Sequence, residues 1–214
     1  MEPTRRTRMS GVQRREQLLA VGREVIAEKG FDAASVEEIA SRAGVSKPVL
    51  YQHFGGKEGL YAVVVDREVR AFTTAIRDSL AAGGHLREIV ERTVYTLLTY
   101  IEESTDGFRI LVRDSPTAFT ASSFSSVMGE VAGEVEDLLA EAFAHRNFPT
   151  DVAPLYAQML VGLYGLTGQY WLEDRTRSKD EVATHLVNLV WNGLRGLDPH
   201  PRLFTISPQG KQSR

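Results

Sequence analysis

The sequence predicts an all-α protein of about nine helices, in which a short helix-turn-helix head precedes a larger helical body. Apolar residues recur at helical spacing over most of the chain, and no stretch shows the alternation of a half-buried strand. Glycine or proline stands at most of the points where that rhythm breaks. The 214 residues are enough to bury a core in one large domain or two small ones.

Composition narrows the classes of function. Apolar residues make up 43% of the chain and charged residues 25%, which is typical of a soluble globular protein. The absence of cysteine excludes disulfides, thiolate metal sites and a cysteine nucleophile. No apolar segment follows the basic N-terminus, and the most apolar window, residues 159–168, is too short to span a bilayer. We therefore expect a cytoplasmic protein with no membrane partner.

Charge is distributed unevenly along the chain. Residues 1–15 hold five arginines against one acidic residue, Glu2, whereas the chain as a whole has a net charge of −3. A basic end on an acidic body fits a DNA-binding head better than a protein that coats nucleic acid. We expect residues 1–11 to form a disordered basic arm. Its arginines either reach DNA or stay solvated, and the sequence favours neither alternative.

The head is expected over residues 12–56 and begins with a helix at residues 12–29, which Gly30 ends. Phe31 is expected to fill the core of the three head helices. The inward-facing residues of the first helix are Leu18, Leu19, Val21, Val25 and Ile26.

Two short helices with a sharp turn between them follow. Ser35 is a good N-cap for the first, and Glu38 three residues later completes a capping-box pattern. Gly44 stands where that helix must stop in a left-handed conformation. Ser46 is expected to cap the second helix, and Pro48 in its first turn removes no helical hydrogen bond.

The second short helix is expected to present a polar and aromatic face. Leu50 and Phe54, one turn apart, can face the interior together with Val45. Donors on the opposite face suit the phosphates and base edges of a duplex, and the helix N-terminus adds partial positive charge. The outward residues are Lys47, Pro48, Val49, Tyr51, Gln52 and His53.

The stretch GVSKPVLYQHFGGKEGLY resembles the signature of the TetR family of transcriptional regulators, and the preceding REQLLAVGREVIAEKGFDAASVEEIASRAG fits the family pattern. The resemblance implies a homodimer on a palindromic double-stranded DNA operator, most often acting as a repressor. It implies base contacts by Lys47, Pro48, Val49 and Gln52, and phosphate contacts by Ser35, Tyr51, His53 and Lys57. Ser46 at the helix N-terminus completes the expected DNA-binding set.

The body is expected over residues 57–197, with a flexible tail at residues 198–214. No Pro- or Ser-rich linker separates head from body, so a long helix at residues 57–82 is itself the connection. A continuous helix can carry a displacement that a flexible linker would absorb. Further helices are expected at residues 85–103, 106–114, within 119–146, 151–174 and 179–197.

The last two helices are candidates for a dimer interface, because TetR-like proteins pair these helices between subunits. Small residues on one face permit close helix approach, and the alternative is that both helices only complete the core of their own subunit. The candidate interface residues are Gly162, Gly165, Gly168, Leu186, Leu189, Val190 and Gly193.

The resemblance also implies a ligand-binding body, and a cavity lined by aromatic and flexible apolar residues suits an elongated apolar or aromatic molecule. The pieces DGFRILVRD, GQYWLED and NLVWNGLRGL are similar to those of members that sense long-chain fatty acyl groups. A fatty acyl-CoA that regulates lipid metabolism is the preferred effector, and a drug that controls an efflux gene is the alternative. The candidate pocket residues are Phe72, Tyr95, Phe108, Arg109, Val112, Phe124, Met128, Met159, Leu163, Tyr164, Tyr170 and Trp191.

Catalysis has no support in the sequence. The five histidines are scattered, with no acid or nucleophile at a motif spacing, and no glycine-rich phosphate loop joins a strand to a helix. We therefore expect no catalytic residue, metal or cofactor. A helical binding or scaffold protein that no longer binds DNA is the main alternative to a regulator. The sequence does not decide whether ligand releases the protein from DNA or recruits it.

Overall fold

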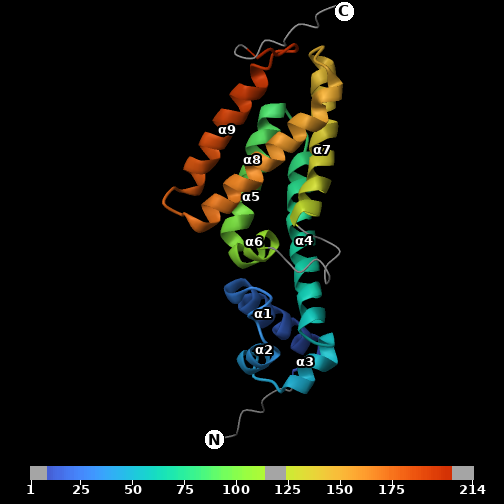
Figure 1. The fold of residues 1–214 in the computed structure, drawn as a ribbon, viewed down its shortest axis with the longest axis vertical. Helices are drawn as coiled ribbons and strands as arrows, with labels where there is room; N and C mark the ends of the chain where they lie inside the picture. The colour runs from blue at the N-terminus through green and yellow to red at the C-terminus, as the bar shows by residue number, and fades with distance from the viewer. Residues whose placement is uncertain (1–8, 114–123, 204–214) are drawn as a thin grey trace, which may run out of the picture.

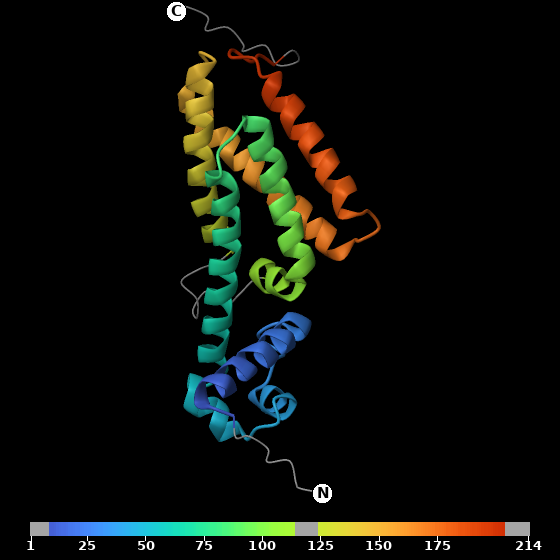
Figure 2. The ribbon, with the colours of Figure 1, turned by 180° about the vertical axis from the view of Figure 1, so that it is seen from behind.

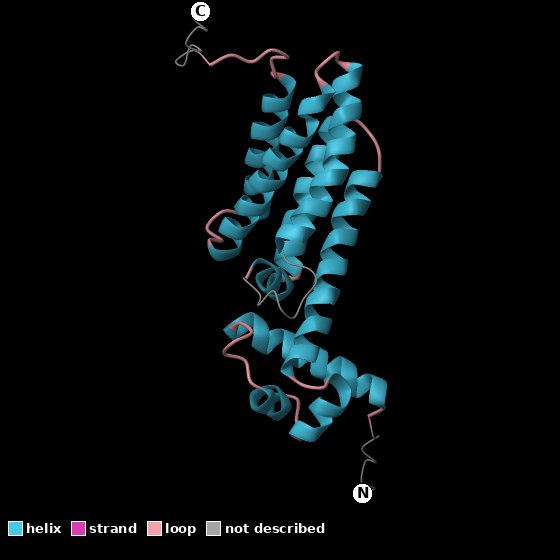
Figure 3. Ribbon diagram, turned by 45° about the vertical axis from the view of Figure 1, so that its right-hand side comes forward, coloured by secondary structure: helices cyan, strands magenta, loops and turns pink. Residues whose placement is uncertain are grey.

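The computed structural model describes residues 9–113 and 124–203, and every regular element in these ranges is helical (Figure 3). This confirms the all-α prediction. The helices of the head and the connector are α1 (Gly11–Lys29), α2 (Val36–Arg42), α3 (Lys47–Phe54) and α4 (Lys57–Ala81). Those of the body are α5 (Leu86–Glu103), α6 (Thr105–Val112), α7 (Phe124–His145), the 3₁₀ turn η1 (Thr150–Val152), α8 (Ala153–Glu173) and α9 (Lys179–Arg195).

The head lies at one end of an elongated molecule, and α4 rises from it along the body (Figure 1). The N-terminal end of the chain leaves from the head, and the C-terminal end leaves from the opposite end of the body. In the body, α5 packs against both α4 and α9, and α7 packs against α8. Seen from behind, α4 and α5 run side by side, and α6 lies below α5 and beside α4, near the head (Figure 2).

The head helices begin after the predicted N-cap residues, but two of the predicted capping interactions are incomplete or absent. Ser35 accepts a hydrogen bond from the Glu38 backbone N–H at 3.1 Å, as expected. The Glu38 carboxylate instead pairs with Lys29 and Arg42, so the expected capping box is only half formed. Ser46 has the extended backbone of an N-cap, yet its side chain makes no cap hydrogen bond to α3.

Glycines at positive φ end α2 and α3, and the sequence predicts this conformation for Gly44. Gly44 follows α2 with φ of 64°, and Gly55 ends α3 with φ of 74°. Because only glycine adopts this left-handed region at little cost, the direction of α3 relative to its neighbours depends on these two positions.

The head core includes the start of α4. Leu18, Ile39, Leu50 and Leu60 are completely buried, and they come from α1, α2, α3 and α4 respectively. A side chain at Gly22 would place its Cβ 2.6 Å from the Leu60 side chain, so α1 and α4 approach closely at this point. The head therefore has no packing boundary at the beginning of α4.

The body core begins farther along the same helix. Phe72, Ile76 and Leu80 of α4 pack with residues of α5, α6, α7, α8 and α9. At 25 residues, α4 is about 37 Å long and runs unbroken from one core to the other. No helix in the described parts of the chain combines the length and the apolar character that a bilayer crossing requires.

Candidate functional site

Helix α3 is held in the head by one side and exposed on the other. Leu50 is buried, whereas Lys47, Pro48, Tyr51 and Gln52 are exposed. These four exposed residues lie within about 140° of one another around the helix. Of the remaining residues expected to face outward, Val49 and His53 are half-buried.

The N-terminal end of α3 suits a negatively charged partner. Its first turn contains no acidic residue, and the exposed Ser46 hydroxyl makes no cap hydrogen bond with the helix. Lys47 pairs with Glu37 of α2 at the surface. Pro48 has no N–H and the Val49 N–H donates to the Ser46 carbonyl at 3.0 Å. The positive end of the helix dipole is therefore what favours a phosphate at this position.

Two side chains of α1 hold the ends of the short helices. The Arg15 guanidinium donates to the His53 carbonyl at 2.6 Å and lies 4.3 Å from the centre of the Phe54 ring. The Gln17 amide donates to the Ala43 carbonyl at 3.1 Å. Sequence reasoning counted Arg15 only as part of a basic terminus, because its partner is 38 residues away and leaves no local signal.

Two expected phosphate-binding residues also have partners inside the head. The Lys57 ammonium donates to the Phe31 carbonyl at 2.9 Å and lies 4.3 Å from the centre of the Phe31 ring. The Ser35 hydroxyl oxygen caps α2. Each group retains a proton to donate, because an ammonium has three N–H donors and a hydroxyl has one O–H.

A cavity lies within the body among α4, α5, α6, α7, α8 and α9, and its lining is almost wholly apolar. Four of the expected pocket residues line it, namely Phe72, Phe108, Met128 and Tyr164. The other lining residues are Ile76, Leu80, Leu86, Ile89, Val90, Thr93, Leu97, Val131, Val135, Leu138, Leu139, Leu160, Val161, Gly165 and Leu194. Its free volume of about 70 Å³ is below the roughly 300–1,000 Å³ of most ligand sites, so a large ligand would have to expand it.

Several expected pocket residues lie elsewhere, because helical periodicity does not tell which side of a body helix is covered. Met159 and Tyr170 are exposed on α8. Tyr95 and Trp191 line a surface groove between α5 and α9, where the Tyr95 hydroxyl donates to Asp180.

The remaining expected pocket residues that do not line the cavity lie on α6, on α8 or outside the described side chains. Arg109 pairs with Asp106 in a surface depression beside Arg175. Val112 and Leu163 pack at the margin of the body core without lining the cavity. The side chain of Phe124 lies outside the described residues.

Tyr164 is unusual among the residues of the cavity wall. Its hydroxyl is the one buried side-chain polar atom without a hydrogen-bond partner in the described parts of the chain. Burial raises the pKa of the Tyr164 phenol well above its usual range, so the group stays protonated. The described chain thus offers this hydroxyl no acceptor, and a ligand oxygen or a water molecule could serve as its partner.

An apolar stripe is exposed along α8. Leu155, Met159 and Leu166 are each more than half exposed, and the exposed Gly162 lies between the last two. The spacing of four, three and four residues places them on one face of the helix. Leu189 and Gly193 are exposed on the neighbouring α9.

The other expected interface residues face the interior of the same chain. Leu186 and Val190 are buried in its cores, and Gly165 lies in the cavity wall. A Cβ on Gly168 would lie 2.8 Å from the Ile101 side chain, so this glycine allows α8 to approach α5 and α6. The expectation that all three glycines share a partner-facing surface is wrong, and only Gly162 is exposed.

Two family models match the chain in succession. The model described as bacterial regulatory proteins, tetR family, matches residues 18–64. The model described as tetracyclin repressor-like, C-terminal domain, matches residues 75–201. Together they cover the head and the body.

Known sequence relatives are regulators of transcription. The HTH-type transcriptional activator FasR of Mycolicibacterium smegmatis is 34% identical over 196 residues, which are 89% of this chain and 87% of FasR. An uncharacterized HTH-type transcriptional regulator of Mycobacterium tuberculosis is 28% identical over 201 residues, which are 90% of this chain and 82% of that protein.

Solved structures share the fold. A TetR-like transcriptional regulator from Rhodococcus sp. RHA1 superposes with a TM-score of 0.71 at 26% identity, over 89% of this chain and all of that one. The fatty acid degradation regulator FadR from Bacillus halodurans superposes with a TM-score of 0.70 at 21% identity, over 85% of this chain and 96% of that one.

The exposed amide of Gln52 gives a first prediction. Gln52→Ala should change the order of preference among operator sequences, because a bidentate amide–base contact contributes about 1–3 kcal/mol of discrimination. Competition binding with operator variants measures this change. Thr74→Ala, at an exposed position of α4 outside the head, is the control and should leave the preference unchanged. Unchanged affinity and preference for Gln52→Ala would remove Gln52 from the base-contacting set.

The Tyr164 hydroxyl gives a second prediction. Tyr164→Phe should stabilise the unliganded protein by about 1 kcal/mol, because it removes a buried polar group that has no partner. Thermal unfolding should show a rise of about 2–4 °C in the midpoint. Tyr170→Phe, on the exposed side of the same helix, should change the midpoint little. A lower midpoint for Tyr164→Phe would show that the hydroxyl is already satisfied.

Proposed function

We propose that this chain, which belongs to the TetR family of bacterial regulatory proteins, is a homodimeric transcriptional regulator controlled by an apolar ligand. Its two heads would bind a palindromic operator in the cytoplasm. A ligand in the body cavity would lower the affinity for that operator. The observation that carries the DNA-binding part is the exposed face of α3, formed by Lys47, Pro48, Tyr51 and Gln52 at the end of the molecule.

Operator binding by this protein would require a dimer, because one short helix makes few contacts with a duplex. Two recognition helices about 34–36 Å apart would enter successive major grooves and add their contacts. The exposed stripe of Leu155, Met159 and Leu166 on α8 would supply an apolar surface for a second copy, and Leu189 of α9 is exposed as well. Exposed apolar stripes of this kind are typical of surfaces that associate. This interface lies on the body, so it leaves both α3 helices free.

The cavity favours a hydrocarbon ligand. Apart from Thr93 and Tyr164, its wall consists of apolar side chains and glycine. Hydrocarbon is stabilised in such a site by burial, whereas a charged group would need a partner that this wall does not offer. We propose a long fatty acyl chain, carried as its coenzyme A thioester, whose polar part remains outside the cavity. The likeness to FadR of Bacillus halodurans, at 21% identity, supports the fold alone.

The walls of the cavity suggest how a ligand acts on the head. Phe72 belongs to α4 and Phe108 to α6, and both helices contact α1. The Arg113 guanidinium, directly after α6, also donates to the Ala27 carbonyl of α1 at 2.7 Å. A ligand that enlarges the cavity would displace these helices and change the spacing of the two heads. A coupling of about 1–3 kcal/mol is enough for a 5–150-fold change in operator affinity.

The effect on transcription depends on where the operator lies. Release from an operator that overlaps a promoter frees the promoter, so the protein would act as a repressor, as the sequence resemblance implies. Release from an operator upstream of a promoter withdraws an activator instead, and FasR is named an activator. We favour the repressor role with genes of lipid metabolism as targets, and the same release mechanism serves either arrangement.

The dimer proposal predicts that a charge on the α8 stripe weakens association. Leu166→Glu should leave a folded protein that is monomeric at micromolar concentration, because each copy would bury an unpaired carboxylate at the interface. Sedimentation velocity measures the association state. Val12→Glu, at an exposed apolar position of the head, is the matched control. A wild-type monomer, or a Leu166→Glu dimer of unchanged affinity, would contradict the proposed interface.

The ligand proposal predicts a dependence on acyl chain length. An operator is first selected from genomic fragments and then titrated with protein in the presence of acyl-CoAs of increasing length. Fluorescence anisotropy should show little effect of short chains and a fall in operator affinity with long chains, because each added methylene buries more apolar surface. Equal operator affinity across the series would exclude the acyl ligand while leaving the DNA-binding function intact. An aromatic drug that alone lowers the affinity would favour the efflux alternative.

A further inference from the structure

Glu68 is a buried carboxylate at a point where four helices meet. It lies on α4 with 9% of its surface exposed. The Arg23 guanidinium of α1 donates to both carboxylate oxygens, at 2.7 and 3.4 Å. The Tyr100 hydroxyl of α5 donates to one of these oxygens at 3.1 Å. One carboxylate therefore binds a side chain of the head and a side chain of the body.

The neighbouring backbone leaves room for this arrangement. Gly107 of α6 lies against the carboxylate, and a Cβ at that position would be 1.8 Å from a Glu68 oxygen and 2.7 Å from the Arg23 guanidinium. Any side chain on Gly107 would therefore displace the ion pair. The absence of a side chain allows α6 to close over Glu68, so α1, α4, α5 and α6 all meet at this carboxylate.

Two partners of Glu68 keep their protons near neutral pH. Burial lowers the pKa of Arg23, but hydrogen bonding and attraction to Glu68 outweigh it, and the pKa is raised overall. Burial, followed by the charge of Glu68, raises the pKa of Tyr100, so the phenol remains a donor. A buried ion is tolerated when its hydrogen bonds are satisfied, and it is strongly destabilising when a partner leaves. The position of α1 is thus sensitive to small displacements of Glu68.

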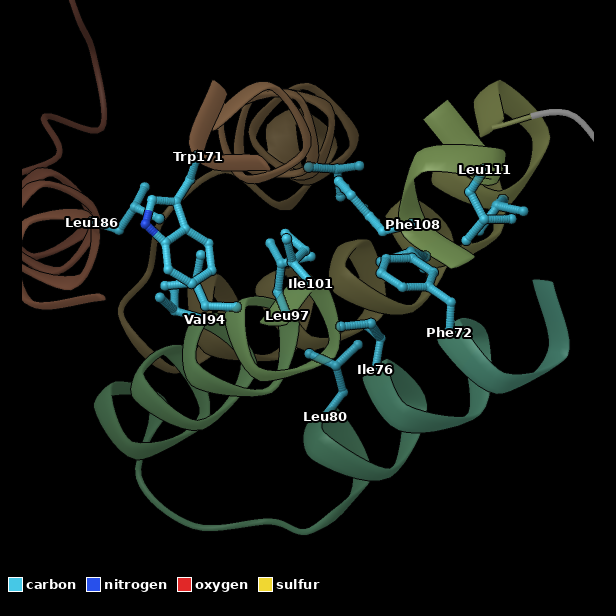
Figure 4. Close-up of a cluster of buried hydrophobic side chains, with 14 of the residues drawn as sticks. Phe72, Ile76, Leu80, Val94, Leu97, Ile101, Phe108, Leu111, Trp171 and Leu186 are labelled. Carbon is cyan, nitrogen blue, oxygen red and sulfur yellow. The ribbon is translucent and has the colours of Figure 1, made fainter. Parts of the chain in front are cut away.

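The same junction touches the wall of the cavity. The Tyr100 ring packs edge-on against Phe72, with ring centres 5.2 Å apart, and Phe72 lies 6.1 Å from Phe108. Phe72 and Phe108 both line the cavity, and Figure 4 shows them meeting between α4 and α6. Glu68 and Phe72 are also one turn apart on α4, so a displacement of the helix at one of them moves the other as well.

We propose that Glu68 is the positioning residue through which the state of the cavity reaches the DNA-binding head. Pressure on Phe72 moves Glu68 and Tyr100 relative to each other and draws the carboxylate away from Arg23. This loosens α1, which carries the Arg15 and Gln17 contacts that hold α3 and α2. The inference rests on the proposed function, because it assumes that a ligand acts through the cavity.

The chain contains a matched control for this ion pair. Glu16 of α1 accepts two hydrogen bonds from Arg67 of α4, at 2.6 and 2.7 Å. This pair joins the same two helices, but it is exposed and touches neither Tyr100 nor the cavity. Glu16→Gln therefore removes a neighbouring ion pair between α1 and α4 while it keeps the Arg23 and Tyr100 partners of Glu68.

The first experiment needs no ligand and compares operator affinity in Glu68→Gln, Tyr100→Phe and Glu16→Gln. Glu68→Gln should weaken operator binding at least fivefold, and Tyr100→Phe should weaken it to a smaller extent. Glu16→Gln should stay within twofold of wild type. Circular dichroism establishes that each variant is folded at the temperature of measurement. Wild-type operator affinity in folded Glu68→Gln would overturn the proposal. Should Glu68→Gln not fold, wild-type affinity in Tyr100→Phe would overturn it.

The second experiment adds palmitoyl-CoA as the probe and measures its binding separately, by calorimetry without DNA. Wild type and Glu16→Gln should lose at least fivefold in operator affinity when the probe is bound. Glu68→Gln should bind the probe within threefold of wild type yet show less than a twofold further loss. An equal loss in Glu68→Gln and wild type would overturn the proposal. Failure of wild type to bind palmitoyl-CoA would instead contradict the acyl ligand, and the ligand-free experiment would still decide the role of Glu68.

Discussion

Helix α4 belongs to two hydrophobic cores at once, and the arrangement of the whole molecule depends on this. Its first half buries Leu60 and Val64 with the head, and its second half buries Phe72 and Ile76 with the body. Neither core can rearrange around α4 without moving residues that the other core holds. Because packed interiors resist continuous deformation, such a helix transmits a change of packing as a displacement.

Polar contacts determine how the head lies against this helix. Exposed ion pairs such as Glu16–Arg67 contribute little, because solvent screens them. The buried Glu68 differs, since its carboxylate must keep its partners from both the head and the body. Apolar packing thus holds the junction together, while one buried charge makes its geometry sensitive to small movements. The Tyr100 and Phe72 rings lie between that charge and the cavity, and a ligand of the proposed kind would act on the head through them.

Sequence signals predicted the features that local chemistry controls. The helices, the left-handed Gly44 and the buried Leu50 all follow from spacing and residue type. Contacts between distant segments left no such signal. The pairing of Arg23 with Glu68 spans 45 residues, and nothing in either local pattern indicates it. The glycines of α8 show the same limit: periodicity predicted one shared face for Gly162 and Gly168, and only the packed structure shows that Gly168 lies inside.

Filling the cavity is proposed to move the heads through α4, and the distance between the two heads measures this movement. The chain has no cysteine, so Ser41→Cys, at an exposed position of α2, attaches one spin label to each head of the proposed dimer. Double electron–electron resonance then gives the distance between heads with and without saturating palmitoyl-CoA. We expect the centre of the distance distribution to shift by several ångströms when the probe binds. An unchanged distribution, with binding of the probe established by calorimetry on the same sample, would show that the cavity does not act on the heads.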